Sequence, residues 1–528
     1  MSSARHRFPG GLGLPLLTLA SALGVFALLQ ALAFQMAGGV FEYPLDDPYI
    51  HLALAEQIAH GNYGVNAGEV SSPGSSALFP LLFAPFADSP IQRFLPLVWN
   101  VVGLGLSAFL WGRLLAESGY GRASWRWLGG TAALIGPIAV MMPHLAFVGM
   151  EHSLHMAASL AIVLGLYRYF DGRGGIWLIV IAAFFVSALR FEGLGLGIAA
   201  AGALMLTGER RAGGLTALAA ILPVAGFIVF LLSLGLDPLP SSVLSKLAET
   251  GGTSTGFFDK RLTSLVITLS QPGGRLLAGL ILALVVLWRL APAVRDSGWG
   301  GFSAAVIFAG LGHLAVGRIG WLNRYEPYII AVLAVSLLVL LPKALGARPS
   351  GRGVLAVVAI LAAGIVTYQP DATRTLPGGP LAIYSQQTQM ARFVKDNLHA
   401  PVAVNDIGLI SWHNPNYVLD LWGLADARAR DVRLSDPTPG WAGRLTDAHH
   451  VPVALVYDNW IGSGIGTNWV KLGDLRLIRP VGFLGGPVVS FYATSPDQVA
   501  FMQATIKAWL PSLSGASMWR WAKGMEAE

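Results

Sequence analysis

The chain contains about eleven apolar runs that are as long, or nearly as long, as a bilayer-spanning helix. In lipid, every backbone polar group must be bonded within the protein, so apolar runs of this length form helices that pack together. Most of the chain therefore folds as a bundle of transmembrane helices. The runs lie near residues 11–40, 91–112, 128–143, 153–167, 176–189, 193–207, 215–236, 275–290, 301–317, 327–342 and 353–368.

Composition and charge agree with this prediction and indicate an orientation. Only 12% of the 528 residues are charged, against about 25% in soluble domains. Arg5 and Arg7 precede a first apolar run much longer than a signal-peptide core, so we expect an uncleaved first span. Arginine and lysine concentrate in alternate loops, which favours an inside N-terminus and an outside C-terminus. On that assignment the outer side carries these acids: Glu42, Asp46, Asp47, Glu56, Glu69, Glu151, Glu192, Asp237, Glu249 and Glu326.

The composition changes after about residue 368. Apolar segments such as "PVAVNDIGLI" and "PVALVYDNW" predict strands that end in polar turns, and "QQTQMARFVKDNL" and "SPDQVAFMQATIKAWL" predict helices. Strands that alternate with helices are typical of an α/β domain. We therefore expect a transmembrane domain at 1–368, with its first outer loop at 41–90, and a small extracytoplasmic α/β domain at 369–528.

Two adjacent carboxylates open the first outer loop in "FEYPLDDPYIHLALAEQIAHG". Pro48 is a good first helical residue, so Asp47 is a candidate N-cap. An apolar stripe from Ile50 to Ile58 at every fourth position predicts a helix that lies along the membrane surface. Capping explains one acid and leaves Asp46, beside a helix N-terminus, as a candidate general base or electrostatic anchor.

Two further segments on the outer side carry polar groups. Serines cluster in "EVSSPGSSALFP", where Ser72 and Ser75 precede an apolar helix and could hold a phosphate; an ordinary capped loop explains them equally. "GMEHSLH" places Glu151, His152 and His155 at the start of a span. A metal site, hydrogen bonds to a substrate and ordinary interfacial residues remain open for this segment, because the H-E-x-x-H order is absent.

Cations stand at the outer ends of three spans. "ALRFEG" contains Arg190 and Glu192, "NRYEP" contains Arg324, and "LDPLPSSVLSK" contains Lys246. A charge at membrane depth costs at least roughly 2.5 kcal/mol, so such residues usually line a polar cavity. Three cations suit an anionic ligand such as phosphate. Snorkelling to the interface is the alternative for each.

Acids and one histidine also follow predicted strands of the C-terminal domain. "NDIGLISWHNPNYVLDLWGLAD" contains Asp406, His413, Asp420 and Asp426. Acids in such loops either cap turns or contact a ligand. The sequence leaves both readings open.

Taken in order, these motifs resemble the bacterial GT-C glycosyltransferases, and most closely the terminal arabinofuranosyltransferase branch. Protein O-mannosyltransferases and the lipid A aminoarabinose transferase are more distant relatives. The resemblance covers about residues 40–430. The segments that carry it are "DDPYIHLALAEQIAHGNYGVNAGEVSSPGSSALFPLL", "GMEHSLH", "LRFEG", "DPLPSSVLSK", "RYEP" and "VAVNDIGLISWHNPNYVLDLWGLAD".

This resemblance implies a GT-C fold and a multi-pass enzyme of the bacterial inner membrane. Such an enzyme transfers a sugar, here arabinofuranose or another pentose, from a polyprenyl-phosphate donor on the periplasmic or outer face. The acceptor would be a cell-envelope glycan, a glycolipid or a protein. The family's catalytic acid pair maps onto Asp46 and Asp47, and its donor-phosphate positions onto Lys246 and Arg324. The serine motif departs from the family pattern at Ser72-Pro73-Gly74.

The full set of candidate site residues follows from the motifs and the resemblance together. Catalysis is assigned to Asp46 and Asp47, and the donor phosphate to Lys246, Arg324, Arg190, Ser72 and Ser75. Substrate contacts are assigned to Tyr49, His51, Glu151, His152, Glu192, Asp406 and His413. We expect membrane lipid around the spans, no nucleic acid and no resident metal or cofactor, with only weak support for a divalent metal.

Two other classes of protein fit parts of the pattern. A transporter or lipid flippase with an outer sensor domain would also place charges between spans, but it would favour inverted repeats and broken helices near the midplane. The sequence shows no such repeat, and its charges gather on one side. A non-catalytic lipid-binding or assembly subunit is the other alternative. Assay with a polyprenyl-phosphate sugar separates the three.

Overall fold

The computed structural model describes residues 11–250, 257–435, 437–479 and 482–526, with the side chains of 246–250 and 257–261 left out of the description. The chain divides into two compact units. Unit 1 is made of Met1–Leu29, Leu97–Gly226 and Gly251–Thr373, and unit 2 of Gln30–Pro96, Phe227–Thr250 and Arg374–Glu528. Each unit is described separately below.

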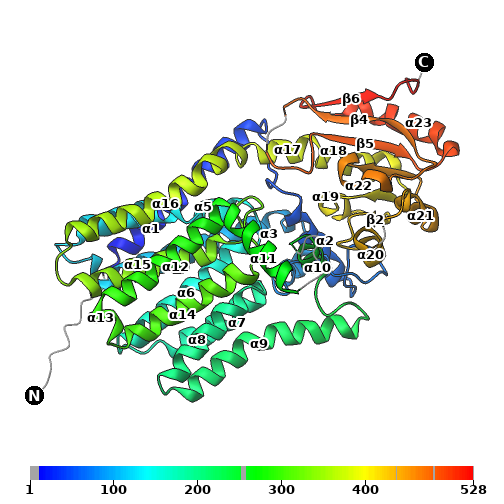
Figure 1. The fold of residues 1–528 in the computed structure, drawn as a ribbon. Helices are drawn as coiled ribbons and strands as arrows, with labels where there is room; N and C mark the ends of the chain where they lie inside the picture. Colours follow the sequence, from blue (N-terminus) through cyan, green and yellow to red (C-terminus); the bar gives the residue numbers. More distant parts are fainter. Residues whose placement is uncertain (1–10, 251–256, 436, 480–481, 527–528) are drawn as a thin grey trace, which may run out of the picture. The chain divides into compact units, whose positions relative to one another are not determined.

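A helix coincides with each of the eleven predicted spans (Figure 1). Within the described residues, nine helical segments are long and apolar enough to cross a membrane, and two shorter apolar helices, α7 and α8, accompany them. The chain is therefore a multi-pass, mainly helical membrane protein. The helices are α1 (Gly13–Met36), α3 (Leu95–Leu115), α4 (Arg126–Ala139), α6 (His152–Phe170), α7 (Ile176–Leu189), α8 (Gly193–Leu206), α9 (Arg210–Ser233), α12 (Pro272–Leu290), α14 (Trp299–Val316), α15 (Pro327–Leu345) and α16 (Gly351–Thr375).

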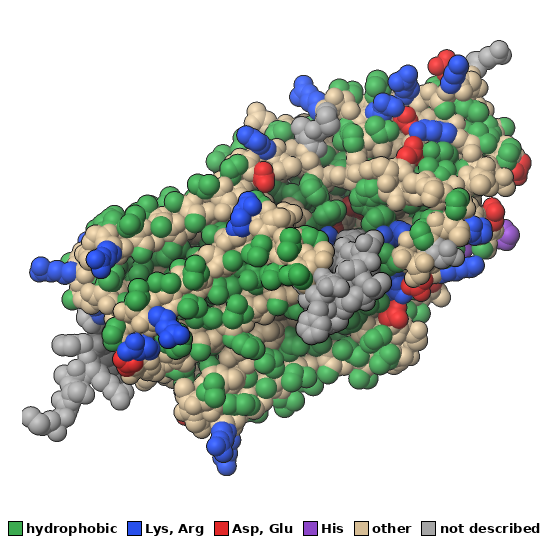
Figure 2. Space-filling view, in the orientation of Figure 1, with side chains coloured by type: hydrophobic (Ala, Val, Ile, Leu, Met, Phe, Trp, Pro, Cys, Tyr) green, Lys and Arg blue, Asp and Glu red, His purple; other side chains and the backbone are tan. Residues whose placement is uncertain are grey.

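The helices of unit 1 pack around α15, which is buried from Pro327 to Pro342. It contacts α6, α12 and α14, and α8 contacts α7 and α14 (Figure 1). Glycine permits close helix approach, since a Cβ on Gly197 of α8 would lie 2.7 Å from the Cβ of Ala220 on α9. Outward-facing side chains such as Leu206 are exposed and apolar, and hydrophobic side chains cover the middle of these helices in Figure 2. These surfaces suit contact with lipid.

Shorter helical segments complete unit 1. They are the π-helical turn η4 (Ala116–Tyr120), α5 (Met142–Phe147), α11 (Phe257–Ser270) and α13 (Pro292–Arg295).

A six-stranded mixed sheet forms the centre of unit 2, in the order β2-β1-β3-β5-β4-β6. β1 pairs in parallel with β2 and β3, with Val402 opposite Val418 and Val453, and the remaining neighbours are antiparallel. The predicted strands are therefore confirmed, and the α/β class with them. The strands are β1 (Val402–Val404), β2 (Val418–Asp420), β3 (Val453–Val456), β4 (Val470–Leu477), β5 (Val488–Ala493) and β6 (Ser517–Trp521).

Both faces of this sheet are covered. Ala403 and Ala454 contribute to an apolar core with Trp441 of α21. On alternate strand positions the side chains point to the opposite face, where Phe491 packs against Phe393 and Trp509. The predicted helices at 386–398 and 496–510 are confirmed as α18 with η5, and as η7 with α23.

The remaining helical segments of unit 2 come from the first outer loop, from residues 227–250 and from the C-terminal region. They are α2 (Asp47–Ala59), η1 (Pro80–Leu82), η2 (Ala84–Phe86), η3 (Gln92–Phe94), α10 (Ser241–Thr250), α17 (Gly379–Ser385), α18 (Gln387–Arg392), η5 (Phe393–Leu398), α19 (Gly408–Ser411), α20 (Ala427–Ser435), α21 (Trp441–Ala448), α22 (Asp458–Ile461), η6 (Gly462–Gly464), η7 (Pro496–Gln498), α23 (Val499–Trp509) and η8 (Leu510–Ser512). The first outer loop thus belongs to the same compact unit as the sheet.

The structure corrects two expectations about α2. The helix begins at Asp47, so Asp46 occupies the N-cap position and makes no side-chain capping bond. Side chains from Pro48 to Ala55 are all buried, and α2 contacts α19, η1 and η2 within unit 2. Because this half of the helix is surrounded by protein, the prediction of an amphipathic helix lying on the membrane surface is wrong for it.

Candidate active site

The Asp46 carboxylate is held by two backbone N–H groups from the C-terminal region. Gly408 donates to Oδ2 at 2.5 Å and Leu409 donates to Oδ1 at 2.9 Å. Both donors are in the first turn of α19, so the acid occupies the positive end of a short helix. The contact joins segments 362 residues apart in sequence. The side chain is buried, with 5% of its surface exposed.

Position 408 has room for glycine only. A Cβ there would lie 2.1 Å from the Asp46 carbonyl oxygen and 2.7 Å from its Oδ2 atom. The opposite end of α19 is bound by Lys395, whose ammonium donates to the carbonyl of Leu409 at 2.8 Å and to that of Trp412. A carboxylate at the start and a cation at the end both match the helix dipole. The α19 turn is therefore a rigid support for Asp46.

Asp406 lies beside Asp46 and forms a carboxyl pair with it. The two carboxyl groups are close enough for each to shift the pKa of the other, and the Gln387 amide donates to Asp406 Oδ2 at 2.7 Å. Burial raises the pKa of Asp46 to about 6, against the lowering effect of the two N–H bonds and Asp406. Burial, with the charges of Asp46 and Asp47, raises the pKa of Asp406 well above its usual range. Because two carboxyl groups this close do not ionise independently, the pair keeps a proton to a higher pH than separate carboxyl groups would.

The predicted substrate residue Tyr49 takes part in a buried network instead. Its hydroxyl donates to Glu42, which also pairs with Arg93 at 2.9 Å and accepts from Thr388 Oγ1 at 2.9 Å. The Tyr49 ring packs near Trp412, with centroids 5.9 Å apart. These contacts join α2 to the C-terminal part of unit 2 and favour a supporting role for Tyr49.

The serine loop packs against α10 within unit 2. The Ser72 carbonyl accepts from the Ser241 N–H at 3.1 Å, and the Ser242 hydroxyl donates to the Gly74 carbonyl at 3.1 Å. His51 and Leu54 line the other side of Gly74. Ser72 and Ser75 are buried. Lys246 lies on α10 one turn further on, but its side chain is outside the described residues.

In unit 1, Arg190 lies at the centre of a second polar cluster. Its guanidinium bonds Glu151 at 2.6 Å, Glu192 at 2.8 Å and His152 Nε2 at 3.1 Å. These partners come from α6 and from the α7–α8 connection. The structure thus brings together four of the residues that the sequence marked in two separate motifs.

Three guanidinium groups surround one tyrosine ring in unit 1. The Cζ atoms of Arg190, Arg318 and Arg324 lie 5.2, 5.6 and 5.3 Å from the centroid of Tyr325. The sequence analysis did not single out Arg318 or Tyr325. Tyr325 directly follows Arg324, and Arg318 lies in the same loop. Their nearness to Arg324 in the sequence is the signal that could have identified them.

The loop between α14 and α15, which carries Arg318 and Arg324, has an uncommon backbone. Three consecutive residues, Trp321, Leu322 and Asn323, have positive φ values of 50°, 62° and 49°. Such strain persists only where the surrounding structure imposes it, and it is concentrated at functional sites. The Gly320 N–H donates to Glu326 at 2.9 Å and closes the loop.

Two of the C-terminal acids are structural. Asp420 accepts from the N–H groups of Trp422, Leu424 and Ala425 at 2.8, 2.6 and 2.7 Å. Asp426 accepts from the Ala429 N–H at 2.9 Å and caps α20. For this pair the turn-capping alternative holds. Asp420 nonetheless lies close enough to Asp406 for its charge to help raise the pKa of Asp406.

His413 lies on the exposed side of α2. Its N–H donates to Glu56 Oε2 at 2.9 Å, and its ring Nδ1 is 3.3 Å from Oε1. Burial would raise the pKa of Glu56, but these bonds hold it below its usual range. His413 is thus bonded to Glu56 of α2, and its predicted substrate contact stays a prediction.

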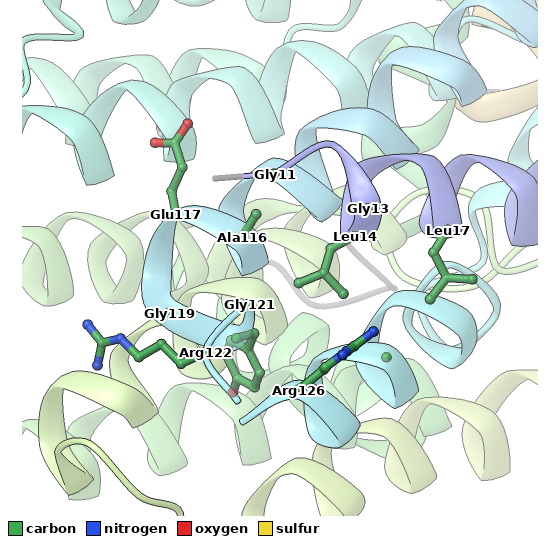
Figure 3. Close-up of a pocket in the computed structure, with 12 residues that line it drawn as sticks. Gly11, Gly13, Leu14, Leu17, Ala116, Glu117, Gly119, Gly121, Arg122 and Arg126 are labelled. Carbon is green, nitrogen blue, oxygen red and sulfur yellow. The ribbon is translucent and has the colours of Figure 1, made fainter. Parts of the chain in front are cut away.

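A cavity of about 580 Å³ in unit 1 lies between the start of α1 and the η4 turn (Figure 3). Glycines, Arg122, Arg126 and Glu117 line it. Glu117 forms ion pairs with Arg113, Arg168 and Arg173. These arginines neutralise the charge of its carboxylate. Among the residues that the structure describes, no three His, Cys, Asp or Glu side chains are placed to hold a metal ion.

Comparison with known proteins gives one family match and several structural likenesses. A family model described as a domain of unknown function, DUF8728, matches residues 381–492. This segment begins in α17 and ends in β5, so it includes Asp406 and the three parallel strands. A search of curated proteins found no significant match.

The solved structures that are similar to the chain include two of one archaeal protein and one of a bacterial protein. The apo oligosaccharyltransferase of Archaeoglobus fulgidus is 13% identical, with a TM-score of 0.49, over 90% of this chain and 74% of that one. The same protein tethered with an acceptor peptide is 11% identical, with a TM-score of 0.44, over 96% and 76%. A mutant of arabinofuranosyltransferase AftD from Mycobacteria is 15% identical, with a TM-score of 0.42. That match covers 90% of this chain but only 41% of AftD.

Proposed function

We propose that the protein is a GT-C glycosyltransferase that moves a sugar from a polyprenyl-phosphate donor to a cell-envelope acceptor. On the motif resemblance, the sugar is arabinofuranose or another pentose. The observation that carries the proposal is the geometry of the Asp46 carboxylate, which is buried, held by the N–H groups of Gly408 and Leu409, and placed beside Asp406. Burial raises the pKa of Asp46 to about 6. A general base works best when its pKa lies near the operating pH.

For the donor phosphate we propose, separately, the arginine cluster of unit 1. Arg318 and Arg324 lie over the Tyr325 ring on a loop of strained backbone, whereas Arg190 beside the same ring is already bonded to Glu151 and Glu192. Guanidinium groups bind phosphate through two donors at once, and they stabilise the charge that develops on a leaving phosphate. The apolar surfaces of the helices in unit 1 can accommodate the polyprenyl chain.

In the proposed reaction an acceptor hydroxyl oxygen attacks the anomeric carbon of the donor sugar. Its proton passes to ionised Asp46, and the bond between the anomeric carbon and the phosphate oxygen breaks. The phosphate oxygen keeps the electron pair and leaves as polyprenyl phosphate. Asp406, held neutral by its raised pKa, donates a hydrogen bond that positions Asp46.

The first test is transfer by the full-length protein in detergent. The donor is farnesyl-phosphoryl arabinofuranose, the acceptor is an arabinofuranose oligosaccharide, and products are measured by mass spectrometry. We expect Asp46→Asn to lose at least about a hundredfold in rate and Asp47→Asn to lose less. Near-wild-type transfer by Asp46→Asn would overturn the assignment. Movement of intact donor across vesicles without transfer would favour the flippase alternative.

The second test separates donor binding from acceptor binding. We expect Arg318→Gln, Arg324→Gln and Lys246→Ala each to raise the donor KM about ten- to a hundredfold, because a charge-assisted hydrogen bond contributes roughly 1.5–3 kcal/mol. Arg275→Gln is the matched control, since Arg275 is exposed at the start of α12. A change confined to the acceptor KM would contradict the phosphate assignment.

A further inference from the structure

The carboxyl ends of β2, β1 and β3 meet at one edge of the sheet in unit 2, because these three strands are parallel. In open α/β sheets, ligands bind outside such an edge. Asp406 follows β1, Trp422 follows β2, and Tyr457 and Trp460 follow β3. The topology therefore places aromatic side chains and the acid pair at the same edge.

These three aromatic residues and one arginine form a continuous series, which we call the edge ladder (Trp422, Trp460, Tyr457 and Arg433). Trp422 and Trp460 have centroids 4.6 Å apart, and Trp460 and Tyr457 have centroids 5.3 Å apart. The Arg433 guanidinium lies 3.7 Å from the Trp422 centroid.

Both tryptophans of the edge ladder are partly exposed. By contrast, Trp441 and Trp509 in the same unit are buried in its core. Trp519 and Trp521 on β6 are also partly exposed neighbours, so exposure alone does not identify a binding surface. What distinguishes Trp422 and Trp460 is their position at the carboxyl edge of the parallel strands.

A single residue links the edge ladder to the acid pair. The Gln387 side-chain amide nitrogen lies 3.0 Å from the Tyr457 hydroxyl and donates to Asp406 Oδ2 at 2.7 Å. The Tyr457 hydroxyl in turn donates to Gln386 Oε1 at 2.6 Å. A ligand on the ladder would therefore lie along the same edge as Asp46 and Asp406.

We propose that the edge ladder binds the acceptor glycan, as a subsite for neutral sugar rings. Sugar rings present C–H faces that pack on aromatic rings, and hydroxyl edges that need hydrogen-bonding groups beside those rings. Arg433, Asp458 and Asn459 are the polar groups nearest the ladder in the chain. A lipid chain would require an uninterrupted apolar surface, which these groups break. The inference rests on the proposed transferase function and adds where its acceptor is held.

The test measures glycan binding by titration calorimetry on the full-length protein without donor. The probes are a hexa-arabinofuranoside and a linear mannohexaose. We expect at least one probe to bind the wild type, and Trp422→Ala and Trp460→Ala each to weaken its binding about tenfold or more. Trp422→Phe and Trp460→Phe should retain most of the affinity, because they keep an aromatic ring. These variants are also less disruptive to folding than the alanine variants.

Trp521→Ala is the matched control, since Trp521 is a partly exposed tryptophan on β6 of the same unit. Failure of both probes to bind the wild type, or unchanged binding by both alanine variants, would overturn the inference. Transfer assays run in parallel separate the two proposals. If the ladder variants transfer sugar with an unchanged acceptor KM, only the subsite proposal is overturned. If the tryptophans are needed for glycan binding but the protein transfers no sugar, only the transferase proposal is overturned.

Discussion

Replacing Gly408 with alanine should inactivate the protein without altering any ionisable group. A Cβ at this position would lie 2.1 Å from the Asp46 carbonyl oxygen and 2.7 Å from its Cγ atom. Real Cβ contacts are essentially never closer than 3.0 Å, so Asp46 and α19 must separate by about 0.9 Å. A misplacement of about 1 Å at a catalytic group can cost about a hundredfold in rate.

The same change should lower stability. Moving α19 away stretches the Gly408 and Leu409 N–H bonds to the Asp46 carboxylate, now 2.5 and 2.9 Å long. Hydrogen bonds to charged groups are worth about 1.5–3 kcal/mol each, so loss of both costs up to about 3–6 kcal/mol. Part of this is recovered if water reaches the carboxylate.

The assay compares transfer rate and thermal unfolding of Gly408→Ala and wild type in the same detergent. Gly515→Ala is the matched control, because a Cβ there meets nothing within 4 Å and it lies in the same unit. We expect the control to match wild type, and Gly408→Ala to lose about a hundredfold in rate and to unfold at a lower temperature. Wild-type rate and stability in Gly408→Ala would refute the close contact between Asp46 and the first turn of α19.

Four more predictions follow from the site and the topology. Because the pKa of Asp46 is raised to about 6, log kcat/KM should fall with unit slope below about pH 6; a flat profile from pH 4.5 to 8 would contradict this. The raised pKa values also mean that folding takes up protons, so the unfolding temperature should rise as the pH falls from 7 toward 5. Asp406→Asn keeps a hydrogen-bond donor beside Asp46 and should retain at least about a tenth of the activity, with its pH limb in place; a loss as deep as that of Asp46→Asn would make Asp406 the base. The chain lacks cysteine, so an impermeant thiol reagent on intact cells should label Ser435→Cys and spare Ser124→Cys; the reverse pattern would invert the topology.

The structure changes how the Asp46→Asn test is interpreted. Both Asp46 oxygens accept backbone N–H bonds, whereas asparagine has one acceptor oxygen and would point its NH₂ group at the second donor. This substitution therefore costs a hydrogen bond as well as the charge. Comparing the unfolding temperatures of Asp46→Asn and Asp406→Asn shows how much of the lost activity comes with lost stability. The remainder is attributed to loss of the catalytic carboxylate.

Periodicity and composition were enough to locate the helices and strands, because those signals are local. Each apolar run coincides with a helix, since lipid leaves the backbone no other partner than itself. The strands β1 (Val402–Val404) and β3 (Val453–Val456) were also recognisable as apolar segments, and Asp426 caps α20 as a turn acid would. The predicted N-cap of α2 was wrong by one residue. The side chain of Asp46, at the true N-cap position, is bound by the N–H groups of Gly408 and Leu409, which are distant in the sequence.

The site itself was decided by contacts that no local pattern encodes. Asp46 and Gly408 are 362 residues apart, and only the folding of the first outer loop onto the sheet brings the acid to the N–H groups of α19. Arg318 joined Arg190 and Arg324 because a left-handed turn at 321–323 directs the loop back onto Tyr325. The sequence alone determined which residue types and elements were available. Tertiary structure decided which carboxylate became buried and paired, because desolvation and hydrogen bonding depend on neighbours that are distant in the chain.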